Sequence, residues 1–76
     1  MSPDKLAYMA NQIGRFFAHQ KHDQAVASIA DHLDKFWDPR MRSGILAHLE
    51  DVQLDPLVRE AIAVIARDAA ARQAPT

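Results

Sequence analysis

Histidines are the residues of this sequence best suited to bind a metal ion, and their spacing argues against such a site. His19 and His22 stand three residues apart, whereas His32 and His48 fall in separate segments. Zinc-binding histidines usually occur with cysteine ligands or in motifs such as His-Glu-x-x-His. The sequence has no cysteine and no such motif. We therefore expect no bound metal or cofactor, and we interpret the histidines as solvated or capping side chains.

The charged residues that most resemble an acid–base cluster lie within one short stretch. Asp31, Asp34 and Asp38 stand close in sequence to Lys35 and Arg40. The charged flank of an amphipathic helix commonly carries such a set, and so small a chain has little volume for an active-site pocket. A Gly-rich phosphate loop or a nucleophile elbow needs more glycine than the two present here. We therefore predict that the chain is not an enzyme.

The composition narrows the class of protein further. The 76 residues have a formal net charge of −1, which offers no bulk attraction to nucleic-acid phosphates. The lack of cysteine suits a cytoplasmic chain, and we expect no signal peptide. No apolar stretch approaches the roughly 20 residues that a membrane span requires. We therefore expect a cytoplasmic protein that binds neither nucleic acid nor a membrane.

The elements that must position these residues are predicted to be helices. Ser2, Asp38 and Asp55 each precede a proline, which places a capping side chain before the first helical position, and Asp23 is a plausible fourth start. Apolar residues between the starts recur at steps of three and four, and no alternating run predicts a strand. We expect one all-α domain over residues 1–76, a small bundle with helices at about 3–19, 23–37, 39–50 and 56–72 and a frayed tail at 73–76.

The two longer amphipathic helices at the N-terminus are expected to pack as a hairpin. Their apolar stripes run from Leu6 to Phe17 and from Val26 to Trp37, and each stripe ends in an aromatic pair. The third helix is short, and the longer fourth helix has an apolar arc of roughly 160°, wider than one-sided packing requires. Gly14 is expected on the side of the first helix opposite the stripe. Either another chain approaches closely there, or Gly14 is a tolerated surface glycine or marks early fraying of the helix.

The segment HLDKFWDPRMR (32–42) combines aromatic and basic residues at a helix boundary. Trp37 either closes the core where the second helix turns into the third, or anchors a partner protein. Arg40 and Arg42 fall in the first turn of a helix, where the dipole disfavours positive charge. We therefore expect both arginines to be paired, either with local aspartates or with acidic groups of a partner.

Three blocks of the sequence closely resemble the small delta subunit of the cytoplasmic NAD-dependent, molybdenum-containing formate dehydrogenases. The blocks keep the order and spacing of that family, and they read MANQIGRFFA (9–18), IADHLDKFWDPRMR (29–42) and LDPLVREAI (54–62). The resemblance implies a non-catalytic accessory subunit that supports assembly or stability of the active complex. It further implies binding to the large catalytic subunit, which carries bis-molybdopterin guanine dinucleotide, in a complex whose beta and gamma subunits hold FMN and iron–sulfur clusters.

The matched blocks and the residue patterns together predict the surface that contacts the partner. Its residues are Asn11, Gln12, Gly14, Arg15, Phe36, Trp37, Asp38, Pro39, Arg40, Met41, Arg42 and Arg59. The sequence leaves open whether the Gly14 face, the corner at 38–42 or part of the fourth helix docks.

Two alternative functions belong to other classes. A short third helix led by two arginines could act as the recognition helix of a nucleic-acid-binding module, although the acidic charge balance disfavours this. A dimeric all-helical enzyme could instead build its site between protomers, which would require self-association and a charged cleft.

Overall fold

The chain forms four helices, with no strand among the residues that the structure describes. The computed structural model describes residues 1–73, with side chains over residues 1–71, and the predicted tail beyond Gln73 lies outside this range. The helices are α1 (Pro3–Phe17), α2 (His22–Phe36), α3 (Pro39–Leu46) and α4 (Pro56–Gln73). The predicted all-α class with two longer helices, a short third and a longer fourth is therefore confirmed.

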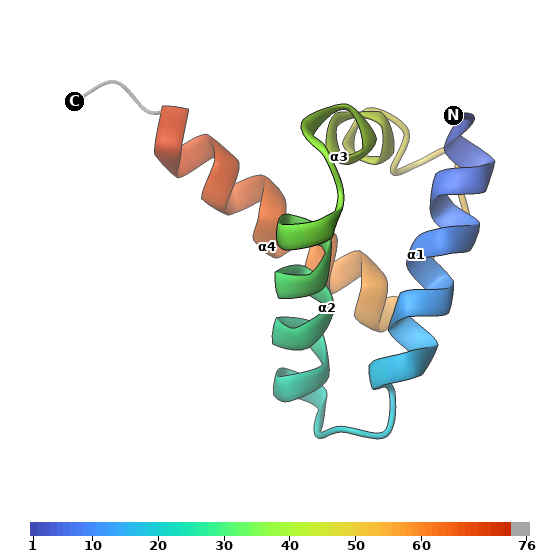
Figure 1. Ribbon diagram of the computed structural model, residues 1–76, viewed down its shortest axis with the longest axis vertical. Helices are drawn as coiled ribbons and strands as arrows, with labels where there is room; N and C mark the ends of the chain where they lie inside the picture. Colours follow the sequence, from blue (N-terminus) through green and yellow to red (C-terminus); the bar gives the residue numbers. More distant parts are fainter. Residues whose placement is uncertain (74–76) are drawn as a thin grey trace.

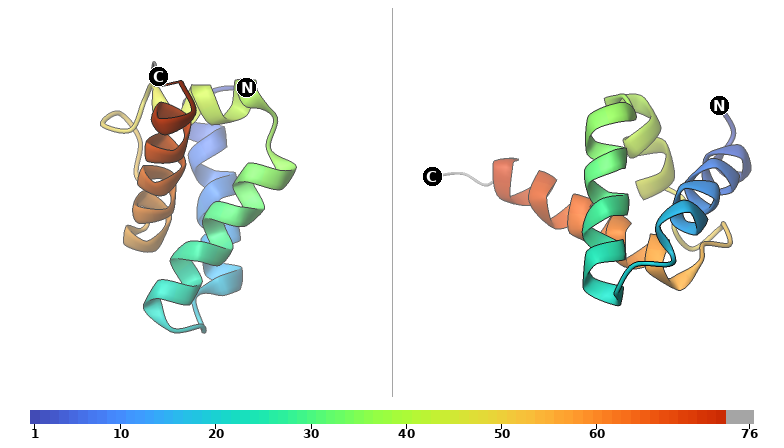
Figure 2. Two further views of the ribbon diagram at one scale, coloured as in Figure 1. Left: turned by 90° about the vertical axis from the view of Figure 1, so that its left-hand side faces the viewer. Right: turned by 60° about the horizontal axis from the view of Figure 1, so that its bottom comes forward.

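The first two helices form the expected antiparallel hairpin, and the other two pack around it (Figure 1). Helix α3 crosses the end of the hairpin opposite its connection. Helix α4 packs mainly against α2 and passes behind it, so that its C-terminal half extends beyond the other helices (Figure 2).

Local capping explains where the helices begin. The Ser2 hydroxyl accepts a hydrogen bond from the Lys5 N–H at 3.3 Å, and the Asp38 carboxylate accepts one from the Met41 N–H at 2.9 Å. Both caps precede a proline in the first turn, where no backbone donor is lost. Asp23 lies in the first turn of α2 rather than before it, because the helix begins one residue earlier, and its charge there suits the helix dipole.

Helices α1 and α3 end earlier than predicted. Helix α3 stops at Leu46 instead of Glu50, and residues 47–52 form turns. The Arg59 guanidinium of α4 donates hydrogen bonds to the carbonyl oxygens of Leu49 at 3.0 Å and of Val52 at 3.4 Å. These bonds satisfy carbonyl groups of the turns, so the segment keeps its conformation without the backbone hydrogen bonds of a helix.

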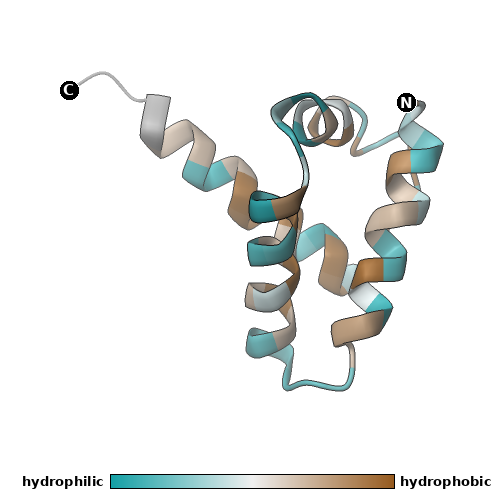
Figure 3. Cartoon of the chain, viewed as in Figure 1, coloured by the Kyte–Doolittle hydropathy of each residue, from teal (hydrophilic) through white to brown (hydrophobic). Residues whose placement is uncertain are grey.

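The core lies where α1, α2 and α4 meet, with α3 closing one end. Hydrophilic residues cover the outer edge of α2 (Figure 3). The largest fully buried side chains come from all four helices, and they are Leu6, Ile29, Leu33, Ile45, Val58 and Ile62.

The structure corrects the predicted orientation of α1. Gly14 is buried rather than exposed, and a Cβ atom added to it would overlap the Cγ2 atom of Val58 on α4. Small residues on α1, Ala7 and Ala10, are buried as well. Close approach of α4 requires small residues at the contact, so α1 turns this face inward. The neighbour that explains Gly14 is therefore α4 of the same chain, and not a second protein.

Candidate partner-binding surface

Two phenylalanines from the ends of the predicted apolar stripes lie on the surface, and one of them, Phe36, was also predicted for the interface. Phe16 on α1 is 73% exposed, and Phe36 on α2 is 72% exposed. The inward turn of the small-residue face of α1 carries Phe16 outward. Large exposed apolar side chains that lie close together mark interaction sites more often than isolated ones do.

The exposed phenylalanines are the two ends of one continuous row of aromatic rings. The Phe16 and Phe17 ring centroids are 5.1 Å apart in an edge-to-face arrangement. The His32 ring centroid lies 6.2 Å from that of Phe17 and 4.7 Å from that of Phe36. We call these four side chains the ring row; it crosses from α1 to α2 and is stabilised by ring contacts along its length.

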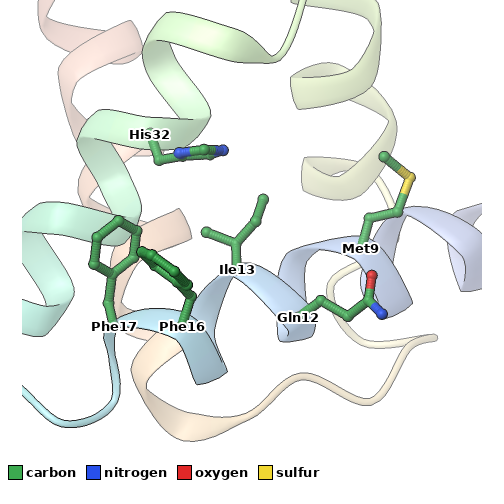
Figure 4. Close-up of a pocket in the computed structure, with 6 residues that line it drawn as sticks. All are labelled: Met9, Gln12, Ile13, Phe16, Phe17 and His32. Carbon is green, nitrogen blue, oxygen red and sulfur yellow. The ribbon is translucent and has the colours of Figure 1, made fainter.

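A groove of about 380 Å³ opens beside the ring row. Met9, Ile13 and His32 extend toward the space between the two helices (Figure 4). The polar groups of the lining are the amide of Gln12, which donates to the Tyr8 hydroxyl at 3.2 Å, and the His32 ring. We call this the α1–α2 groove, and its lining residues are Met9, Gln12, Ile13, Phe16, Phe17 and His32.

The corner after α2 is built from internal contacts. Trp37 is 5% exposed, so its indole belongs to the core and is not available as a surface anchor. The Arg42 guanidinium donates hydrogen bonds to the carbonyl oxygens of Asp34 at 2.8 Å and of Trp37 at 2.7 Å. Arg42 therefore caps the C-terminal end of α2, and its partners are backbone carbonyls rather than the carboxylates that we expected.

The remaining corner residues lie at or near the surface. Asp38 and Pro39 are exposed and start α3, and Met41 is half-buried against the core. Arg40 is exposed. Of the predicted interface residues from Phe36 to Arg42, Phe36 and Arg40 are thus the two that face solvent and take no part in starting α3 or in capping α2.

Asn11, Arg15 and Arg59, all predicted for the interface, contact the segment between α3 and α4. The Asn11 amide donates to the Gln53 carbonyl at 3.0 Å and accepts from the Asp55 N–H at 2.9 Å. Arg15 lies 4.0 Å from the Asp55 carboxylate, and both side chains are largely exposed, which makes this ion pair weak. Asn11 and Arg59 therefore both have a structural role, because their side chains bond backbone groups of the segment between α3 and α4.

The sequence contained a signal for the exposed position of Phe16, which the predicted interface did not include. Adjacent residues of a helix point about 100° apart, so one ring of a pair such as Phe16 and Phe17 lies nearer the edge of the core face than the other. The same holds for Phe36 and Trp37 at the end of α2. An aromatic pair at the end of each stripe therefore marks a place where one ring can reach the surface, and both exposed rings, Phe16 and Phe36, lie on the α1–α2 side of the molecule.

Two of the four histidines lie beside carboxylates. The His22 ring lies 2.6 Å from the Glu60 carboxylate, and the His48 ring lies 3.1 Å from that of Asp51. Within the described part of the chain, no group of three His, Asp or Glu side chains is arranged to hold a metal ion. Over the same residues, no helix has the length and apolar character needed to cross a membrane.

A small helical domain with exposed rings beside an apolar groove has the features of a module that binds another protein. Comparison with known families identifies the family to which this chain belongs. The chain belongs to the family of NADH-dependent formate dehydrogenase delta subunits (FdsD), whose model matches residues 5–62. No curated protein and no solved structure shows significant similarity to it.

Proposed function

We propose that this chain is a non-catalytic accessory subunit that binds the large catalytic subunit of formate dehydrogenase and supports assembly or stability of the active complex. The observation that carries the proposal is the ring row, whose ends, Phe16 and Phe36, are nearly three-quarters exposed beside an apolar groove. Membership in the delta-subunit family supplies the partner complex.

The chemistry of the redox reaction belongs, on this proposal, to the other subunits. The resemblance of the sequence implies that they hold bis-molybdopterin guanine dinucleotide, iron–sulfur clusters and FMN. It also implies that the beta and gamma subunits share the complex and that the enzyme acts in the cytoplasm. This chain has no cysteine to bind an iron–sulfur cluster.

The proposed mechanism is stabilisation by preferential binding. A subunit without catalytic residues changes the catalytic subunit only by binding one of its conformations more tightly than the others. Binding to the folded, cofactor-containing form would raise the stability of that form in proportion to the affinity.

Two features disfavour the alternative functions. The groove lining offers one amide and one imidazole as polar groups, which is not the charged cleft that an enzyme shared between protomers would need. Arg42 is engaged by the carbonyl groups at the end of α2, so α3 does not present two free arginines to a phosphate backbone.

Gentle purification of the tagged chain from its own cells tests the proposal. We expect the catalytic subunit to be recovered in constant proportion, identified by mass spectrometry, with molybdenum in the same fraction. Recovery of the catalytic subunit without molybdenum would indicate an assembly factor that leaves before the cofactor is inserted. Recovery of the chain alone would contradict the proposal.

A further inference from the structure

We infer that the α1–α2 groove binds an amphipathic α-helix of the catalytic subunit, with the apolar face of that helix on the ring row and an acidic flank beside Lys5. The inference rests on the proposed function, because it names the part of the partner that this surface receives.

The walls of the groove determine the backbone conformation of its occupant. Both walls are α-helices, whose backbone N–H and C=O groups are bonded within each helix. The lining adds the polar side chains of Gln12 and His32. An extended segment would bury backbone groups that find no partners there, which is costly. A helix satisfies its own backbone and brings only side chains, so the groove favours a helix.

The spacing of the lining residues fits such an occupant. Met9, Ile13 and Phe16 follow one row of α1 at steps of four and three. This row is about 10 Å long, or two helical turns. A helix placed along it would insert apolar side chains at i, i+4 and i+7, which is the usual pattern of a helix bound in a groove.

The charges at the rim indicate the flank of that helix. Lys5 is exposed one turn before Met9 on the same row, and the lining residues include no carboxylate. Lys35, three residues after His32, already pairs with Asp31 at 3.1 Å. Charge complementarity therefore favours Asp or Glu on the partner near Lys5.

Site-specific photo-cross-linking in the assembled complex tests the inference. Benzoylphenylalanine is introduced in place of Met9 or of Phe16, and the attachment points on the partner are mapped by mass spectrometry. A bound helix would place the two attachment points about seven residues apart, since both helices rise by 1.5 Å per residue. An extended segment would place them about three residues apart. Benzoylphenylalanine in place of Ala63, exposed on α4, serves as the control position.

Affinity measurements on matched variants complete the test. Phe16→Glu should weaken binding of the catalytic subunit by about tenfold or more, whereas Ala63→Glu should leave it unchanged. Lys5→Glu should weaken binding by several-fold, and added salt should weaken binding to the wild-type chain.

The outcomes separate the inference from the proposed function. Attachment points about seven residues apart beside acidic residues would support the inference. A spacing of about three, attachment to a second copy, or cross-links from position 63 alone would overturn the inference and leave the accessory role intact. Unchanged affinity of the Phe16→Glu variant would likewise overturn only the inference. Failure of the wild-type chain to bind the catalytic subunit would overturn the proposed function itself.

Discussion

At the residue scale, long polar side chains complete the backbone bonding that the short helices leave open. Arg42 reaches two carbonyls at the end of α2, Arg59 reaches two in the turns after α3, and Asn11 bonds both ways to the segment before α4. Hydrogen bonds from charged donors stabilise more than neutral ones do. A domain with a small core therefore depends on these few side chains.

Arg42→Ala is expected to lower the free energy of unfolding by about 2 kcal/mol, because two carbonyl groups lose a charged donor. Urea unfolding followed by circular dichroism measures the change. Arg40→Ala is the matched control, since Arg40 is exposed on the same helix, and it should cost less than about 0.5 kcal/mol. Equal effects of the two substitutions would contradict the capping role of Arg42.

Gly14→Ala is expected to destabilise the domain, although alanine is the better helix former by about 1 kcal/mol. The added Cβ atom meets Val58, which is fully buried and stiff about χ1, so overpacking costs about 1–3 kcal/mol. A double-mutant cycle with Val58→Ala checks the reason, because the smaller side chain should reduce the cost of Gly14→Ala by about 1 kcal/mol. Strictly additive costs would exclude this contact as the cause.

At the element scale, helix starts and the core face of α2 were predictable from the sequence, whereas the core face of α1 was predictable only in part. Serine or aspartate before proline has a local cause, and the structure confirms the caps at Ser2 and Asp38. The faces depend on which helix approaches which. The sequence pattern favoured the largest apolar side chains as the core face of α1, yet α4 packs on Gly14 and turns Phe16 outward.

The residues of the candidate site were predictable only in part, because their exposure also depends on how the helices pack. Phe36 and Arg40 were predicted as interface residues and are exposed. Trp37, Arg42 and Asn11 were also predicted for the interface, but in the fold Trp37 is buried in the core, and hydrogen bonds to backbone groups engage Arg42 and Asn11. Such contacts follow from tertiary packing, which residue spacing alone does not specify.

Asn11→Ala should release the segment between α3 and α4, which the Asn11 amide holds at Gln53 and Asp55. We expect a loss of about 1–2 kcal/mol in the free energy of unfolding and faster hydrogen exchange of the Asp55 N–H. Gln12→Ala, one residue away and exposed, should leave that exchange rate unchanged. An unaltered rate in the Asn11→Ala variant would show that the segment does not depend on this side chain.

At the scale of the whole molecule, the proposed function assigns stability and docking to different aromatic residues. Trp37 is buried and Phe36, its neighbour in sequence, is exposed. A partner that contacts the exposed end of the ring row would therefore not have to remove side chains from the core.

Trp37→Ala should cost about 3–5 kcal/mol and abolish most of the helicity, because a small domain has little stability to lose. Phe36→Ala should cost about 0.5 kcal/mol or less and should weaken association with the catalytic subunit. Circular dichroism reports the first effect and affinity measurement the second. A Trp37→Ala variant that stays folded but no longer binds the catalytic subunit would show that Trp37, and not Phe36, serves binding.

Deletion of this chain from its own cells, followed by complementation, tests the accessory role most directly. The measurement is the molybdenum content and the formate-oxidising activity per purified catalytic subunit. We predict that both fall in the deletion strain, recover with the wild-type chain, and stay low with Phe16→Glu, which should be folded but unable to dock. Full molybdenum content and activity in the deletion strain would contradict the accessory role.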